Sequence, residues 1–248
     1  MSKKDITTES IPLNKKFIDK MSDNDAISFL LIDQIEAAQT VHKSHLQIKK
    51  ASLAIYKHLK SSDYSRLIYV GAGTSGRLGV QDGIELIPTF GWKSNRIDFV
   101  IAGGKKALTK SIENAEDDIN DAKTKIISKQ IKQKDVLIAV SASGNTPFTI
   151  SAIKEASKKG ALTIGISNNK ESILNDIVDI SITLLTGAEA VAGSTRLKAG
   201  TAQKICLNTI STFIMTKIGK VKNGRMINLM PMNEKLRKRL ELINKDRL

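Results

Sequence analysis

Apolar residues change their spacing near residue 60 of the chain. Before that point they recur every three or four positions, as at Ile27, Leu30 and Leu31, which predicts one or two helices over residues 24–60. After it, short runs rich in Ile, Val and Leu alternate with stretches of helical periodicity. The runs that predict strands are residues 66–71, 97–102, 135–140, 161–166 and 179–184.

These runs lack a clean alternation of apolar and polar positions, which is typical of strands buried on both faces of a parallel sheet. Helices are predicted over residues 76–87, 105–131, 146–159, 171–176 and 195–219, the last capped by Ser194-Thr195. The alternation predicts an α/β fold, a three-layer αβα sandwich with a five-stranded parallel sheet, flanked by N-terminal helices.

The same pattern divides the chain into three parts. Residues 1–60 are predicted to form an arm, irregular over the first 22 residues, and helices that pack on the core. Residues 61–220 form the α/β domain. Residues 221–248 form a polar, basic segment with some helical character.

Composition narrows the class of protein. The chain has 248 residues, 41% of them hydrophobic and 26% charged, which is ordinary for a globular domain. No apolar run approaches the ~20 residues that span a bilayer, and the polar N-terminus lacks a signal peptide's apolar stretch. Cys206 is the only cysteine, which excludes an intrachain disulfide and a cysteine metal cluster. We therefore expect a cytoplasmic protein without a membrane partner.

The net charge of +14 suggests anionic partners. Residues 217–248 alone carry ten Lys or Arg against three acidic residues. Nucleic acid is disfavoured, because aromatic residues are only 4% and no recognised binding motif is present. We expect a solvated, lysine-rich surface that helps attract an anionic small substrate.

Two loops after predicted strands carry the candidate chemistry. One, at residues 71–77, is Gly-Ala-Gly-Thr-Ser-Gly-Arg, and the other, at residues 141–147, is Ser-Ala-Ser-Gly-Asn-Thr-Pro. A strand, a loop and a helix N-terminus together direct free N–H groups and the helix dipole at one point, which favours an anion.

The first loop also matches the dinucleotide fingerprint G-x-G-x-x-G. However, the second strand ends without the acidic residue that would hold a ribose. Hydroxyl groups in both loops favour a phosphosugar instead. The alternative for either loop alone is a tight turn with a helix cap.

The motifs around these loops resemble sugar isomerase (SIS) domains and, more narrowly, N-acetylmuramic acid 6-phosphate etherases. The resemblance rests on GAGTSGRLG at residues 71–79, ENAEDD at 113–118 and GSTRLKAGTAQK at 193–204. It implies cleavage of a D-lactyl ether by β-elimination and water addition, giving N-acetylglucosamine 6-phosphate and D-lactate. It also implies a homodimer and a small C-terminal helical domain, which these 248 residues do not include.

β-Elimination needs a base and an acid, and no metal or cofactor in principle. The resemblance assigns these roles to Glu116 and Glu85, with Glu85 as the proton donor. A donor must stay protonated, so we expect Glu85 to be desolvated among its apolar neighbours. The expected substrate-binding residues are Gly73, Thr74, Ser75, Ser141, Ser143, Asn145, Thr146, Glu189 and Lys198.

Two other functions fit the same loops. A non-catalytic phosphosugar-binding regulator would not need both glutamates. A sugar-phosphate isomerase of this fold often uses a histidine to open the ring, but His42, His45 and His58 all lie in the N-terminal helical region.

Overall fold

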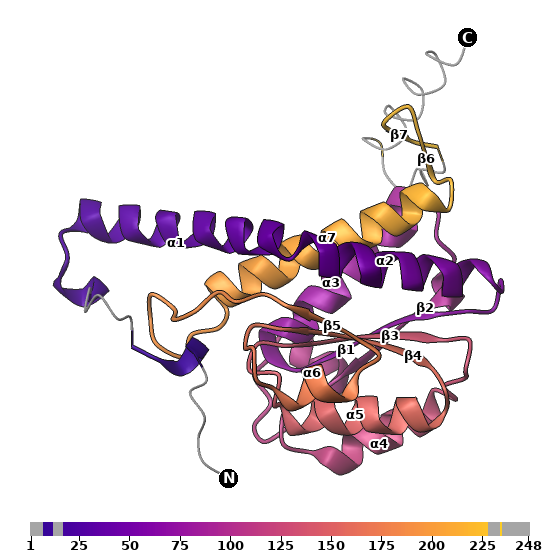
Figure 1. The fold of residues 1–248 in the computed structure, drawn as a ribbon. Coiled ribbons are helices and arrows are strands. Elements are labelled where there is room, and N and C mark those ends of the chain that lie inside the picture. The colour runs from indigo at the N-terminus through magenta and orange to yellow at the C-terminus, as the bar shows by residue number, and fades with distance from the viewer. Residues whose placement is uncertain (1–6, 12–16, 228–233, 235–248) are drawn as a thin grey trace.

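The computed structural model describes residues 7–11, 17–227 and 234, with a parallel sheet at its centre (Figure 1). Its five strands run in the order β2-β1-β3-β4-β5. The predicted strands are confirmed, each within one residue at either end. Their bounds are β1 Leu67–Gly71, β2 Ile97–Ile101, β3 Val136–Ser141, β4 Leu162–Ser167 and β5 Ile180–Thr183.

Helices cover both faces of this sheet, which confirms the αβα sandwich (Figure 1). Successive strand residues point to opposite faces. Ile68 and Val70 therefore belong to one core, whereas Leu67 and Tyr69 belong to the other. One layer contains α4 Ile119–Ser128, α5 Pro147–Lys158 and α6 Ile173–Ile177, and the other contains α1 Asp23–Lys43, α2 His45–Lys60, α3 Gly73–Phe90 and α7 Lys198–Lys217.

Short elements complete the described part of the chain. They are the 3-10 turns η1 Thr7–Glu9, η2 Ile18–Lys20, η3 Ser94–Arg96 and η4 Gly104–Leu108, and a hairpin of β6 Val221–Lys222 and β7 Arg225–Met226. Most of the predicted basic segment, residues 228–233 and 235–248, lies outside the described residues. None of the described helices is long and apolar enough to cross a membrane.

The prediction of a single helix over residues 105–131 is wrong. Gly103 and Gly104 adopt positive φ angles of 72° and 65°, and the chain then forms η4. No regular element follows until α4, which Asp118 initiates by accepting the N–H groups of Asn120 and Asp121 at 3.0 and 2.8 Å. The aspartate cap and the two glycines thus outweigh the apolar periodicity.

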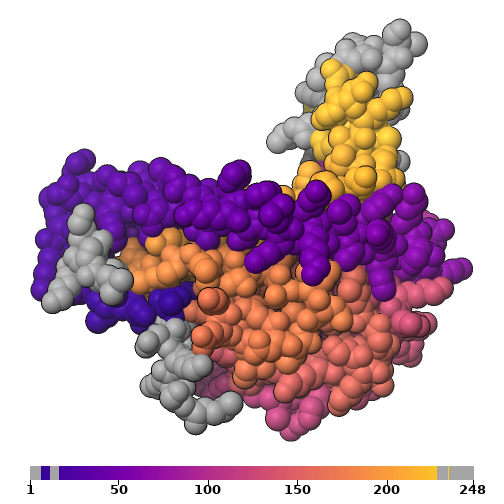
Figure 2. All heavy atoms as spheres, viewed as in Figure 1, coloured from indigo at the N-terminus to yellow at the C-terminus, as the bar shows by residue number. Residues whose placement is uncertain are grey.

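Helix α1 projects beyond the edge of the sheet, and Figures 1 and 2 show it with α2 as the outer layer of its side. The helix carries apolar side chains that are more than half exposed, namely Ile27, Leu31, Ile32 and Ile35. A contiguous apolar surface of this kind is typical of a protein–protein contact.

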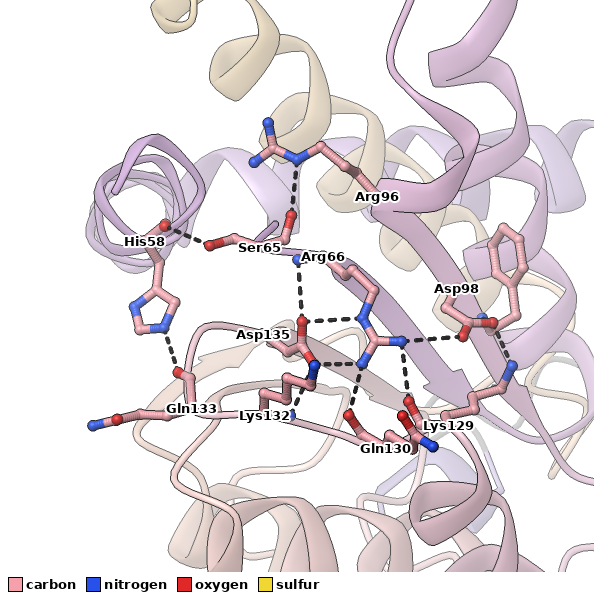
Figure 3. A network of polar contacts seen from close by, with 11 residues as sticks. His58, Ser65, Arg66, Arg96, Asp98, Lys129, Gln130, Lys132, Gln133 and Asp135 are labelled. Atoms are coloured by element: carbon pink, nitrogen blue, oxygen red, sulfur yellow. Dashed lines mark hydrogen bonds and ion pairs between the residues drawn. The ribbon is translucent and has the colours of Figure 1, made fainter. Parts of the chain in front are cut away.

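An ion pair joins the amino ends of β1 and β3 (Figure 3). Arg66 donates to both carboxylate oxygens of Asp135, at 3.1 and 2.6 Å, and to the carbonyls of Lys129 and Gln130 at 3.0 and 3.2 Å. The hydrogen bond to Asp135 raises the pKa of Arg66 above its ordinary value. This ion pair lies at the amino ends of the two strands, at the opposite edge of the sheet from the loops that follow their carboxyl ends.

Candidate active site

A cavity lies where β1 and β3 end. Because β1 pairs with β2 on one side and β3 on the other, the chain leaves these two strands in opposite directions. Ligands of open parallel sheets bind at such a point, beyond the carboxyl ends of the strands. The cavity has a volume of about 270 Å³ and is lined by Glu9, Ala72, Thr74, Ser75, Glu116, Ser141, Ala142, Ser143, Thr146, Gly193 and Thr195.

The first loop gives the cavity a helix N-terminus. Helix α3 begins at Gly73, three residues earlier than predicted, and Gly73 itself has a φ of +52°, in the left-handed region that favours glycine. The first backbone hydrogen bond of the helix runs from Gly76 to Ala72 at 3.0 Å. The N–H groups of the first turn that come before Gly76 have no acceptor within the helix, so they can donate hydrogen bonds to an anion.

A buried relay orients the hydroxyl group of Ser75. Ser75 donates to Gln203 Oε1 at 2.9 Å, Gln203 donates to Asn168 Oδ1 at 2.9 Å, and Asn168 donates to the Leu184 carbonyl at 3.1 Å. Since a carbonyl only accepts, Leu184 fixes the orientation of both amides. The Ser75 oxygen is therefore left as an acceptor. Neither Gln203 nor Asn168 is among the site residues predicted from the sequence.

The second loop gathers hydroxyl groups at the end of β3. Ser141 Oγ accepts the N–H of Gly144 at 3.1 Å and lies 2.9 Å from Thr146 Oγ1. Ser143 Oγ accepts the N–H of Asn145 at 3.1 Å, which leaves its own hydrogen for a ligand or for Ser141, 3.5 Å away. This arrangement offers hydrogen-bond donors to phosphate oxygens.

Glu116 presents a free carboxylate to this cavity. Its backbone carbonyl accepts the N–H of Phe148 at 2.9 Å, which ties the loop before α4 to the first turn of α5. Its Oε1 lies 2.8 Å from the position that a Cβ at Gly73 would occupy. Among the described residues, its carboxylate has no hydrogen-bond or ion-pair partner, so it is available to a ligand.

The structure adds a carboxylate that the sequence analysis missed. Glu9, from η1, also lines the cavity. Its Oε2 lies 2.8 Å from the position of a Cβ at Gly193, whose φ is +75°. Each of the two carboxylates therefore lies against a glycine with a positive φ, in the space that a side chain at that position would enter.

Glu85 does not line the cavity of its own chain. It follows Gly73 by twelve residues on α3, a rise of about 18 Å at 1.5 Å per residue. The expectation that it is desolvated is wrong for the single chain, since Glu85 is exposed and its neighbour Ile84 is 48% exposed. Asn145 is not among the residues that line the cavity either, and its Oδ1 accepts the N–H of Ile173 at 2.9 Å.

Glu189 and Lys198 meet at a separate cavity of about 110 Å³ beside α1. Glu189 is fully buried and accepts the N–H groups of Lys198 and Ala199 at 2.8 and 3.0 Å. This carboxylate therefore caps α7, and the prediction that Ser194-Thr195 caps it is wrong. The ammonium group of Lys198 pairs with Asp33 at 2.5 Å and Glu36 at 3.3 Å.

Burial raises the pKa of Glu189, although its two backbone hydrogen bonds oppose that rise. Both side chains of this pair bind parts of the chain itself: one holds the start of α7, and the other fastens α7 to α1. Neither lines the cavity at the ends of β1 and β3.

Two family models match the chain. The glucokinase regulatory protein N-terminal SIS domain matches residues 48–157, and the SIS domain matches residues 118–212.

Curated relatives match over nearly the whole chain. An N-acetylmuramic acid 6-phosphate etherase of Clostridium acetobutylicum is 45% identical over 232 residues, which are 94% of this chain and 76% of the relative. Another, from Enterococcus faecalis, is 41% identical over 246 residues, 99% of this chain and 81% of the relative.

Solved structures share the fold at low sequence identity. A phosphoheptose isomerase from Francisella tularensis has a TM-score of 0.61 at 17% identity, covering 79% of this chain and 100% of its own. The Vibrio vulnificus NanR protein complexed with ManNAc-6P has a TM-score of 0.52 at 14% identity, covering 90% of this chain and 69% of its own.

Proposed function

The chain belongs to the N-acetylmuramic acid 6-phosphate etherase family, and on that premise we propose that the D-lactyl ether of this phosphosugar is cleaved in the cavity at the ends of β1 and β3. The observation that carries the proposal is the carboxylate of Glu116, which has no partner among the described residues and lies beside a helix N-terminus and a hydroxyl-rich loop. The first supplies an acid/base group, and the other two supply the donors that a phosphate requires.

Substrate binding follows from these donors. The phosphate accepts hydrogen bonds from the first-turn N–H groups of α3 and from Ser141, Ser143 and Thr146. Thr74 contacts the sugar or its phosphate from the first loop, and the Ser75 oxygen, whose own hydrogen is donated to Gln203, accepts a hydrogen bond from a sugar hydroxyl group.

The reaction begins from the open-chain aldehyde, in which the C2 proton is acidic. Glu116 removes that proton, the electron pair forms the C2–C3 double bond, and the C3–O bond breaks. A second acid protonates the oxygen of the departing lactate. Water then adds at C3 and a proton returns to C2, which gives N-acetylglucosamine 6-phosphate and D-lactate.

Glu85 is the proposed second acid, and we place it in the cavity of a neighbouring copy. The rise of about 18 Å along α3 supports this, because a glutamate side chain spans only a fraction of that length. Homodimer formation is supported by the exposed apolar face of α1. A mainly apolar groove of about 330 Å³ between α1, α2 and α7 adds to that surface. In the dimer, contact with the second copy supplies the desolvation that a proton donor needs.

We also place the protein in the cytoplasm and expect no nucleic-acid partner. A phosphorylated sugar does not cross a bilayer unaided, so its enzyme is expected where the sugar is phosphorylated. Positive surface charge then serves to attract the anionic substrate.

Release of D-lactate from N-acetylmuramic acid 6-phosphate tests the function. We expect the wild-type protein to release lactate and Glu116→Gln to lose more than about 99% of the rate, since general acid–base catalysis contributes 10²–10⁴-fold. Glu113→Gln is the matched control, because Glu113 is exposed and does not line the cavity. Phosphosugar binding without lactate would identify a regulator, and conversion of an aldose phosphate to a ketose phosphate would identify an isomerase.

A further inference from the structure

We propose that Glu9 is a substrate-contacting residue whose carboxylate accepts hydrogen bonds from hydroxyl groups of the sugar. The segment that carries it, residues 7–11, is then a wall of the site and not only an arm on the surface. The identity of the sugar rests on the proposed function, whereas the contact itself follows from the geometry of the segment.

One amide holds this segment in place. Asn169 Oδ1 accepts the backbone N–H and the hydroxyl of Thr7 at 2.8 and 2.9 Å. Its Nδ2 donates to the carbonyl of Ala142 at 2.9 Å and to Thr8 Oγ1 at 3.2 Å. Because the Ala142 carbonyl only accepts and the Thr7 N–H only donates, the orientation of the amide is fixed. Asn169 therefore joins the N-terminal segment to the phosphate-binding loop.

The opposite side of the segment is fixed as well. Thr8 is fully buried, and its carbonyl accepts the N–H of Gly193 at 3.2 Å. At the same glycine the Glu9 carboxylate takes the space of an absent side chain. Buried contacts on both sides make the position of Glu9 a consequence of packing, although the carboxylate itself is exposed to the cavity.

The charge of the cavity indicates which part of a ligand Glu9 meets. Glu9 and Glu116 are the only charged residues in the described lining, and Glu9 has no hydrogen-bond or ion-pair partner among the described residues. A carboxylate accepts hydrogen bonds from sugar hydroxyl groups but repels a phosphate dianion. Glu9 therefore favours one orientation of the ligand, with its hydroxyl groups toward η1 and its phosphate toward the second loop.

Calorimetric binding to two probes tests this assignment. Wild type, Glu9→Gln and Glu9→Ala are titrated with N-acetylglucosamine 6-phosphate and with inorganic phosphate. We expect Glu9→Ala to raise the Kd of the phosphosugar about tenfold, in line with loss of a hydrogen bond to a charged group. Glu9→Gln should have a smaller effect because its amide oxygen still accepts, and the Kd of inorganic phosphate should stay within about twofold or fall, since a repulsive charge is removed.

Three results separate the explanations. An unchanged phosphosugar Kd in Glu9→Ala overturns the assignment. An equal loss for both probes also overturns it, because the substitution then acts through the fold. Glu113→Gln is the control and should match wild type. Failure of the wild type to release lactate would overturn the proposed function alone, since the comparison of Kd values requires only binding.

Discussion

Glu189 accepts the backbone N–H of Lys198 at 2.8 Å, although the two residues lie nine positions apart in the chain. The same lysine extends its side chain to Asp33 on α1. One residue thus connects the loop after β5, the start of α7 and the projecting helix.

Replacing Lys198 with Met should destabilise the protein strongly. Asp33 is only 5% exposed, and its Oδ2 has no hydrogen-bond partner among the described residues. Loss of the ammonium group leaves this carboxylate buried without a counter-charge, so we expect the free energy of unfolding to fall by about 3–5 kcal/mol. Urea denaturation measures the change. Lys204→Met, at an exposed position of α7, should shift it by less than about 0.5 kcal/mol.

Deprotonation of Lys198 at alkaline pH should lower the free energy of unfolding. Burial alone would lower the pKa of Lys198, but the hydrogen bonds and charges of Asp33 and Glu36 raise it above the ordinary value. Because the folded-state pKa exceeds the unfolded one, this stabilisation is complete below pH of about 10.4 and disappears as pH rises through the folded value. Urea titrations at pH 8 and pH 11 should show the gap between wild type and Lys198→Met narrowing at the higher pH. A constant gap would contradict the assignment.

Mixing two inactive variants should restore activity if Glu85 works in a neighbouring copy. In a dimer of Glu85→Gln with Glu116→Gln, one of the two sites then contains both intact glutamates. Random exchange of equal amounts makes half of the dimers mixed, so about a quarter of the wild-type rate returns in a two-fold dimer. Lactate release after mixing and re-equilibration gives the answer. If both glutamates served the same chain, every site in the mixture would lack one of them and no rate would return.

Ser143→Ala should weaken phosphosugar binding. The Ser143 hydroxyl retains a hydrogen for the ligand because its oxygen already accepts the N–H of Asn145. A hydrogen bond to a charged group contributes about 1.5–3 kcal/mol, which corresponds to a rise in Kd of roughly ten- to a hundredfold. Calorimetry with N-acetylglucosamine 6-phosphate measures it. Ser157→Ala, an exposed position on α5, should bind as wild type does.

Asp135→Ala should cost stability but spare the site. The side chain of Asp135 is 2% exposed and pairs with Arg66 at the amino ends of β1 and β3, whereas the cavity lies at their carboxyl ends. Removing one partner of a buried pair costs about 3–5 kcal/mol. Urea denaturation should show that loss, and the KM for the phosphosugar, measured where the variant is still folded, should remain within about twofold of wild type. A large rise in KM would show that the ion pair also shapes the cavity.

Local patterns predicted the framework of this fold. Runs such as Val136 to Ser141 are recognisable as strands in the sequence because buried parallel strands are continuously apolar. Both hydroxyl loops were found for a related reason: each directly follows such a run, and parallel strands bring their carboxyl ends to one edge.

Features that depend on distant contacts were missed. The start of α7 is set by a carboxylate from another loop, and nothing in the adjacent residues Ser194-Thr195 reveals this. Glu9 lies in the cavity because Asn169 holds the nearby Thr7, and these two residues are 162 positions apart in the chain. Glu85 was assigned from its sequence motif. The motif does not show that α3 carries this residue away from the cavity at the start of the helix.

The placement of β1 between β2 and β3 also bears on how the chain reaches its native state. The bond from Arg66 to Asp135 closes a loop across 69 positions. Closing a loop of that length carries an entropic cost of about 4 kcal/mol before any contact offsets it. Pairing of β1 with β3 is therefore expected to form late and slowly, after the local helices. Until it forms, the two hydroxyl loops have no common edge, so refolding chains should regain helical circular dichroism before they bind a phosphosugar.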